Sequence, residues 1–440
     1  MLKSIEGYFA QRNSILKLFL VFGLVGMFGT PAFSQSKMGA TVANPMGLQT
    51  EYPHQIELKE FEKQLGKKLN FSANPLFSAR VSSGDLPSID QRLPKEPLVI
   101  LPYDAIGNYG GTLKGAALAM ESGTSEILGW RQVNLVRMSK DNVTLTPDVA
   151  KSWKWNSDST EVTFRLREGH KWSNGEPFTV DDVVFFMDDI IHNKELNAEI
   201  PSSWMHGGKP VRVQKVDDLN VKFIFAIPNF GFLNYLGTEG SYFTPYAAAN
   251  VLKPLHIKYN PNANQVAKDA GYKSWVEYFK VHYHKWKDAV TATKFGLKVP
   301  TLESHLLAES PNSQRRIFIA NPYYFKVDTA GNQLPYIDRH HERFLDKELW
   351  SLEVINGSID QKSQNVDIGN YPLFKENEKK GDYRVNLNSG QIGPVIIFNL
   401  THLERLFTHD LAVDRLFGRD CPLKTAGFSI LFCYQQEIDS

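Results

Sequence analysis

Hydrophobic and polar positions alternate most clearly between residues 148 and 193. Apolar side chains alternate with polar ones over residues 162–166, a pattern typical of a strand with one buried face. Trp153 and Trp155 lie two apart and therefore share one face of a preceding strand. The polar residues 156–159 between these segments indicate a turn, so the pattern predicts a β-hairpin.

A helix is predicted directly after this hairpin. Thr179 and Asp182 have the spacing of a capping box, and acidic residues favour the positive end of a helix. The following apolar residues fall at i, i+3, i+4, i+7 and i+8 between residues 183 and 191, which predicts one buried stripe. Residues 217–226 repeat the alternation of a strand.

The remaining elements follow from shorter patterns. We expect a helix within residues 57–69, a connecting arm at 88–97, a short apolar run at 98–101, and a tight turn with positive φ at Gly110 and Gly111. We also expect helices within 266–271 and 275–286, a strand within 315–324, a helix followed by a strand within 346–360, and a strand buried on both faces at 395–399.

The N-terminal segment has the features of a secretory signal. Basic residues precede a 12-residue apolar run at 18–29, and Ala32 and Ser34 supply the small side chains expected before a cleavage site after Ser34. This run is shorter than the roughly 20 apolar residues of a membrane-spanning helix, although an uncleaved anchor is the alternative. No cysteine lies nearby, so we expect an exported, periplasmic protein without a lipid anchor.

Composition narrows the class of protein. The 440 residues carry 49 basic and 48 acidic side chains, a balance that argues against a nucleic-acid partner. The only cysteines are Cys421 and Cys433, which excludes a disulfide framework and a four-cysteine zinc site. A length of 440 residues suffices for two or three domains.

No catalytic motif stands out. Asp181 and Asp182 are adjacent on a helix and point about 100° apart, so capping explains them better than acid–base catalysis. The pairs His282/His284 and His340/His341 lack a third ligand, and such histidines are usually surface residues. Residues 328–332 resemble a calcium loop, but Ala330 offers no side-chain oxygen, so a plain turn is expected. We expect no metal, cofactor or enzymatic activity.

Aromatic residues beside glycine or charged residues are the remaining candidates. Trp130, Arg131, Trp204 and Tyr242 lie in predicted loops, where exposed rings suit sugars or peptide side chains. The alternative for each of these residues is packing in the core or at an interface.

Ordered motifs now show a resemblance to a known family. LTPDVAKSW at 145–153, VTFRLREG at 162–169 and WSNGEPFTVDDV at 172–183 resemble the signature of the family 5 extracellular solute-binding proteins. RLPKEP at 92–97, IGNYGG at 106–111 and NPYYFKVDTAGNQLPYID at 321–338 are similar to one branch of that family. The resemblance covers residues 92–402.

This resemblance implies an α/β fold of the type II periplasmic-binding-protein kind, a two-lobed clamshell with an additional domain. It also implies capture of peptides or oligosaccharides between the lobes, peptides being favoured, and delivery to the permease subunits of an ABC transporter. The implied division is a signal peptide at 1–34, an N-terminal extension at 35–97, the first lobe with its inserted subdomain at 98–338, the beginning of the second lobe at 339–402, and a tail without resemblance at 403–440.

The motif comparison finds no family pattern after His402. We therefore expect an incomplete C-terminal part, and the two late cysteines fit an altered reading frame. A truncated family member without a working cleft is the main alternative function, and a secreted hydrolase is a further alternative that no side-chain arrangement supports.

Overall fold

A computed structural model describes residues 55–102, 105–118, 126, 133–139, 143–239, 243–283, 300–308 and 314–387. The chain divides into two units, residues 1–383 and 384–440, and the elements below all belong to the first. The expected signal peptide, the strand at 395–399, His284 and both cysteines lie outside the described residues. Within the described ranges, no helix combines the length and the apolar character needed to cross a bilayer.

The predicted hairpin belongs to a four-stranded antiparallel sheet in the order β10-β11-β7-β6. Its strands are β6 (Ala150–Trp155), β7 (Glu161–Leu166), β10 (Arg212–Lys215) and β11 (Asn220–Ile224). Trp155 pairs with Val162 across the turn, which confirms the predicted hairpin. The inward-facing side chains of β7 are buried, and Phe164 meets Phe223 of β11 edge-on with ring centroids 5.6 Å apart.

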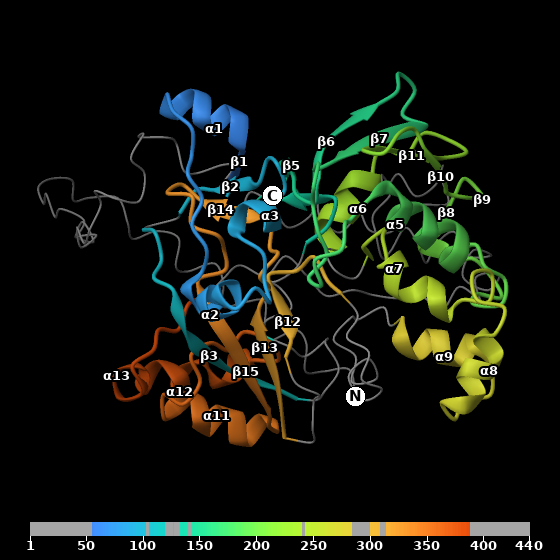
Figure 1. The fold of residues 1–440 in the computed structure, drawn as a ribbon. Helices are drawn as coiled ribbons and strands as arrows, with labels where there is room; N and C mark the ends of the chain where they lie inside the picture. The colour runs from blue at the N-terminus through green and yellow to red at the C-terminus, as the bar shows by residue number, and fades with distance from the viewer. Residues whose placement is uncertain are drawn as a thin grey trace, which may run out of the picture. The chain divides into compact units, whose positions relative to one another are not determined.

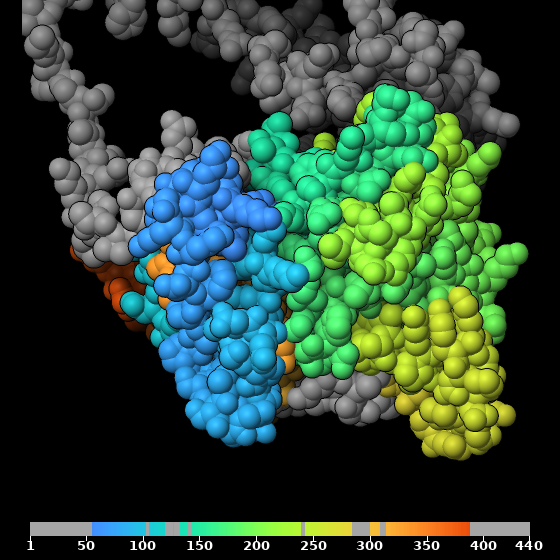
Figure 2. Space-filling view, turned by 45° about the horizontal axis from the view of Figure 1, so that its top comes forward, coloured from blue at the N-terminus to red at the C-terminus, as the bar shows by residue number. Residues whose placement is uncertain are grey.

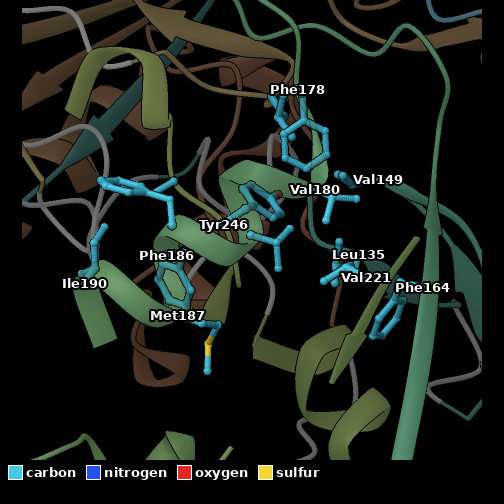
Figure 3. Packing of buried hydrophobic residues seen from close by; sticks show 14 of the residues in the cluster. Leu135, Val149, Phe164, Phe178, Val180, Phe186, Met187, Ile190, Val221 and Tyr246 are labelled. Carbon is cyan, nitrogen blue, oxygen red and sulfur yellow. The ribbon is translucent and has the colours of Figure 1, made fainter. Parts of the chain in front are cut away.

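A continuous helical stretch covers this sheet, formed by α5 (Val180–Phe185) and the π-helical segment η3 (Phe186–Ile191). All five positions of the predicted apolar stripe are buried. Figure 3 shows Phe186, Met187 and Ile190 in the core that also holds Phe164 and Val221 of the sheet. The sequence pattern therefore identified both sides of this core.

Shorter elements complete this region. They are β4 (Val136–Met138), β5 (Leu145–Pro147), η4 (Ser202–Trp204), β8 (Met205–His206), β9 (Lys209–Pro210), α6 (Phe232–Glu239), α7 (Ala249–Leu252), η6 (Lys253–Leu255), α8 (Ala263–Asp269) and α9 (Trp275–His282). The two predicted helices near residues 266 and 275 are confirmed as α8 and α9, as far as the described residues extend.

The N-terminal segment is integrated with a distant part of the chain. It contains β1 (Gln55–Glu57), α1 (Leu58–Leu65), η1 (Pro75–Phe77), α2 (Ser78–Ser82), α3 (Ile89–Arg92) and β2 (Leu98–Ile100). β2 pairs with β1 and, in parallel, with β14 (Lys326–Asp328). Figure 2 shows residues 55–100 as a continuous surface in blue to cyan.

The connecting arm predicted at 88–97 is more than a linker. It contains α3, and the side chain of Arg92 is fully buried. Its Nη1 donates hydrogen bonds to the carbonyl oxygen of Pro322, at 2.6 Å, and to Oε1 of Gln333, at 3.0 Å. Because these partners lie more than 200 residues away, the local sequence contains no sign of them.

A second four-stranded sheet has the order β12-β13-β15-β3. Its strands are β3 (Gly110–Ala117), β12 (His305–Leu307), β13 (Arg315–Ala320) and β15 (Ile337–Phe344), with β3 and β15 parallel. Gly110 and Gly111 have the expected positive φ but open strand β3 rather than forming a separate turn. The expected domain boundary at 338/339 falls inside β15, which is bonded to strands of the first-lobe range.

Helices α11 (Lys347–Ile355), α12 (Tyr371–Glu376) and α13 (Glu378–Gly381), with the short turn η7 (Ile368–Asn370), follow this sheet. Figure 1 shows these helices beside β15 and β3, and Trp350 and Phe374 stack between α11 and α12 with ring centroids 6.1 Å apart. The helix expected within 346–360 is confirmed, but the strand expected after it is wrong. Gly357 reverses the chain at φ +71° and only Ile359 is buried, so no alternating face develops.

Candidate functional site

The predicted capping residues form the centre of the family-like motif. The carboxylate of Asp182 accepts hydrogen bonds from the backbone N of Thr179 at 2.8 Å, from Nε1 of Trp172 at 3.2 Å and from the backbone N of Ala249 at 2.9 Å. Burial raises the pKa of Asp182 to about 6, although these hydrogen bonds favour its charged form. Asp182 therefore connects the helix start to two other segments and supports the scaffold.

Asp181 points away from this network. Its exposed carboxylate lies 3.1 Å from Nζ of Lys215 on β10. The two adjacent carboxylates thus diverge, and the capping box expected at Thr179 and Asp182 is confirmed.

Trp204 is the one predicted ligand-binding residue that lies within the described ranges, since Trp130, Arg131 and Tyr242 lie outside them. Its ring is only 3% exposed and stacks on Phe243 with centroids 4.2 Å apart. The short helical turn η4 directs the indole inward, toward Phe186 and Phe232 as well. The structure thus gives Trp204 a packing role, and its contact with a ligand stays a prediction.

One exposed aromatic side chain borders this buried stack, and two further exposed apolar side chains precede it along the chain. Tyr235 is 41% exposed, and its ring lies 4.3 Å from that of Phe243 in an edge-on arrangement. Phe230 and Ile227, which precede α6 along the chain, are 78% and 49% exposed. We call Ile227, Phe230 and Tyr235 the aromatic rim. Exposed rings can stack on sugar faces or on apolar peptide side chains.

The sequence reasoning missed the aromatic rim. Phe230 precedes Gly231 and therefore met the criterion of an aromatic residue beside a glycine that selected Trp130. Tyr235 had no such signal, because neither a glycine nor a charged residue adjoins it and no element was predicted for the segment that forms α6.

The loop between β14 and β15 is organised by hydrogen bonds to the carboxylate of Asp328. Oδ1 of Asp328 accepts from the backbone N of Ala330 and Asn332, at 2.8 and 2.9 Å. Its Oδ2 accepts from Nδ2 of Asn332 at 2.7 Å and from the hydroxyl of Tyr336 at 2.6 Å. The carboxylate is fully used by the loop itself, which confirms the plain turn expected from Ala330.

Buried charges join segments that are far apart in sequence. Nζ of Lys326 on β14 lies 2.6 Å from Oδ1 of Asp148, and both side chains are buried. Arg167, which directly follows β7, pairs with Glu57 on β1. Between these cations lies His170, which is buried against Phe325 with ring centroids 4.6 Å apart. Burial and the neighbouring cations lower the pKa of His170 to about 3.

A second buried cluster lies at β13 and β15. Nε of Arg316 donates to Oε2 of Glu342 at 2.5 Å, and Nε2 of His340 lies 3.6 Å from Oε1 of the same carboxylate. His340 is fully buried, so the expectation that it lies at the surface is wrong. Its strand position faces the core, and two adjacent strand residues cannot both face solvent. Across the described ranges, no three histidine, cysteine or acidic side chains converge as metal ligands.

Comparisons with known proteins agree with this architecture. The sequence profile of bacterial extracellular solute-binding proteins, family 5 (middle part), matches residues 144–413. The match thus continues beyond His402, where the motif comparison had it end. The periplasmic alpha-galactoside-binding protein of Rhizobium meliloti is 29% identical over an alignment of 306 residues that covers 64% of this chain and 40% of that protein.

A second relative and a solved structure are also similar to this chain. A probable ABC transporter-binding protein of Deinococcus radiodurans is 27% identical over 194 residues, 44% of this chain and 28% of that protein. The solved structure of an oligopeptide-binding protein, OppA, superposes with a TM-score of 0.64 at 32% identity, covering 74% of this chain and 51% of that one. The chain therefore spans about half or less of the length of these relatives.

The likeness to OppA confirms the expected mixed α/β fold of type II periplasmic binding proteins. The profile covers more than half of the residues. The chain accordingly belongs to family 5 of the bacterial extracellular solute-binding proteins.

Proposed function

We propose that this protein is the solute-binding component of an ABC importer, which captures a peptide or an oligosaccharide and delivers it to permease subunits. The observation that carries the proposal is the family match over residues 144–413, together with the likeness to an oligopeptide-binding structure at a TM-score of 0.64. Family 5 proteins bind their solute and do no chemistry on it, and we propose the same here.

Two ligand classes follow from the relatives. OppA is named for oligopeptides, and the Rhizobium meliloti relative is named for alpha-galactosides. We propose peptides first, because the OppA likeness has the higher identity and covers the larger share of this chain. Alpha-galactosides are the second candidate class. The aromatic rim and the proposed contacts Trp130, Arg131 and Tyr242 suit either class, since aromatic rings pack on both.

We further propose that residues 1–34 direct export to the periplasm and that cleavage follows Ser34. The apolar run at 18–29 and the small residues before position 35 support this. N-terminal sequencing of the protein from a periplasmic extract tests it: a start at Gln35 is expected, and a start at Met1 in the membrane fraction would contradict it.

Ligand-dependent stabilisation tests the binding function. The secreted chain is heated in the presence of a pool of tripeptides and tetrapeptides, or of raffinose and stachyose. A ligand at 100 times its Kd stabilises the folded state by about 2.7 kcal/mol, which is readily measured as a higher Tm. A folded protein that no member of either pool stabilises would contradict the proposal and favour the alternative of a family member without a working cleft.

A further inference from the structure

The imidazole of His256 lies at the junction between η3 and the helical pair α8–α9. It is 1% exposed, and four aromatic rings surround it: those of Phe185, Tyr259, Trp275 and Phe279, with centroids 6.3, 5.8, 4.6 and 5.5 Å away. Figures 1 and 2 show α8 and α9 in yellow, next to the green and lime elements that carry η3 and α7. His256 is therefore a contact point through which the pair is held.

The hydrogen bonds of the ring require one particular neutral form. The backbone N–H of Lys258 points at Nδ1 from 3.1 Å, so Nδ1 must accept. Nε2 lies 3.1 Å from the carbonyl oxygen of Asp189 and must therefore carry the proton that is donated there. A second proton would have to occupy Nδ1, where it would face the Lys258 N–H.

A side-chain amide nitrogen also lies close to the ring. Oδ1 of Asn193 accepts from the backbone N of Glu195 and Leu196, at 2.9 and 3.1 Å, which fixes the orientation of the side chain. Its Nδ2 consequently approaches Nε2 of His256, at 3.1 Å. Nδ1, which would take a second proton, thus faces the N–H of Lys258, whereas Nε2 lies close both to the carbonyl oxygen of Asp189 and to the amide nitrogen of Asn193.

The charged groups around the ring are already engaged. The carboxylate of Asp189 on η3 pairs with Nζ of Lys258 and with the hydroxyl of Tyr259, both at 2.5 Å. Glu195 accepts from Nε1 of Trp275 on α9 at 3.1 Å. Lys253 on η6 lies over the ring of Tyr259, and Glu277 and Lys280 of α9 are exposed. His282 of the same helix is buried, with Nδ1 2.7 Å from the carbonyl oxygen of Tyr278.

We propose that His256 forms an acid-sensitive packing contact. It holds α8 and α9 against η3 while its ring is neutral, and protonation of the ring weakens this packing. Burial lowers the pKa of His256, in agreement with a site that disfavours the cation. The unfolded chain then binds the proton more readily than the folded one, so acid weakens this contact as the pH falls below the ordinary histidine value of about 6.5. The inference concerns this contact alone and does not depend on any ligand.

Hydrogen–deuterium exchange of the secreted chain at pH 7.5 and pH 5.0, corrected for the intrinsic exchange rate, tests whether the His256 contact is sensitive to acid. Peptides covering residues 263–283 should exchange faster at the lower pH, because the folded ring binds its second proton less readily than the unfolded one. Peptides covering β6 and β7 should keep their protection. His256→Gln, whose amide can donate and accept but does not titrate, should abolish the pH effect on residues 263–283.

His206→Gln is the matched control, because Nε2 of His206 also lies 3.0 Å from a backbone carbonyl, that of Pro228, but far along the chain from α8 and α9. It should leave the acid response unchanged. If His256→Gln does not fold, Asn193→Asp replaces it: the variant keeps the oxygen that caps Glu195 and Leu196 and places a charge beside Nε2, so the response should shrink. Equal protection at both pH values in the native chain, or an undiminished response in both variants, would overturn the proposal.

Discussion

Arg167, directly after strand β7, and Glu57, at the end of strand β1, form a bidentate ion pair. Nη1 and Nη2 of the fully buried guanidinium donate to Oε2 and Oε1 of the carboxylate, at 2.9 and 2.7 Å. Nε of the same side chain donates to the carbonyl oxygen of Asp148 at 2.8 Å. One arginine therefore joins the N-terminal segment to the hairpin of the family signature.

Removing the carboxylate should destabilise the protein strongly. In Glu57→Ala the guanidinium stays buried without its counter-charge, and such a change typically costs about 3 kcal/mol of unfolding free energy. Glu168→Ala removes an exposed partner of Lys95 and should cost less than about 1 kcal/mol. Urea unfolding of both variants measures the difference. Equal losses of unfolding free energy would show that the buried ion pair contributes no more to stability than the exposed one.

Asp182 and Asp181 offer a second matched comparison on one helical turn. Asp182→Ala leaves the backbone N of Thr179, the backbone N of Ala249 and the indole N–H of Trp172 without their acceptor, at a cost of about 3 kcal/mol. Asp181→Ala removes an exposed carboxylate and should change stability by less than about 0.5 kcal/mol. Thermal unfolding of the two variants should rank them in that order, and the reverse order would contradict the assigned roles.

Local patterns in the sequence predicted the hairpin, the capping box and the helix stripe, because each depends on residues within a few positions of one another. The burial of Arg92 depends on Pro322 and Gln333, and the parallel pairing of β3 with β15 joins residues more than 200 apart. No local pattern contains such partners. The family resemblance added the fold but did not identify a ligand.

The candidate site shows the same limit. Trp204 looked like a loop aromatic, but Phe243, which buries it, follows 39 residues later. His340 looked like a surface histidine, but its environment is set by Arg316 and Glu342, which lie on two strands of one sheet. In both cases an exposed or buried state depended on residues that only the fold brings near.

His170 should make the protein less stable in acid. Its folded-state pKa is lowered to about 3 by burial, whereas an unfolded histidine titrates near 6.5. Between these values the unfolded chain binds more protons, so unfolding free energy falls by up to about 1.4 kcal/mol for each pH unit below 6.5. His170→Phe should reduce the slope of stability against pH between 7 and 5, and an unchanged slope would contradict this role.

Two glycines with similar backbone angles separate steric crowding from backbone strain. A Cβ at Gly175, with φ +90°, would lie 2.7 Å from the hydroxyl oxygen of Tyr323, whereas a Cβ at Gly208, with φ +72°, would meet nothing within 4 Å. Both alanine variants carry the cost of a positive φ, about 1 kcal/mol. Gly175→Ala should lose about 1–3 kcal/mol more because of overpacking, and chemical unfolding measures both. Equal losses would mean that Tyr323 moves aside freely.

Trp204 and Tyr235 should respond to substitution in opposite ways, because both contact Phe243 but only one is exposed. Trp204→Ala opens a cavity in the core and should lower the unfolding free energy by about 3–5 kcal/mol. Tyr235→Ala removes an exposed ring of the aromatic rim and should change stability by less than about 1 kcal/mol.

If the rim contacts the solute, Tyr235→Ala should also weaken binding of the best peptide or alpha-galactoside about tenfold, as measured by calorimetry. A tenfold loss of affinity corresponds to roughly 1.4 kcal/mol of contact energy. Leu349→Ala, on the exposed face of α11, is the control for binding, since it removes a comparably exposed apolar side chain elsewhere. Full affinity in Tyr235→Ala would remove the rim from the ligand site and leave the proposed contacts Trp130, Arg131 and Tyr242 to be tested in the same assay.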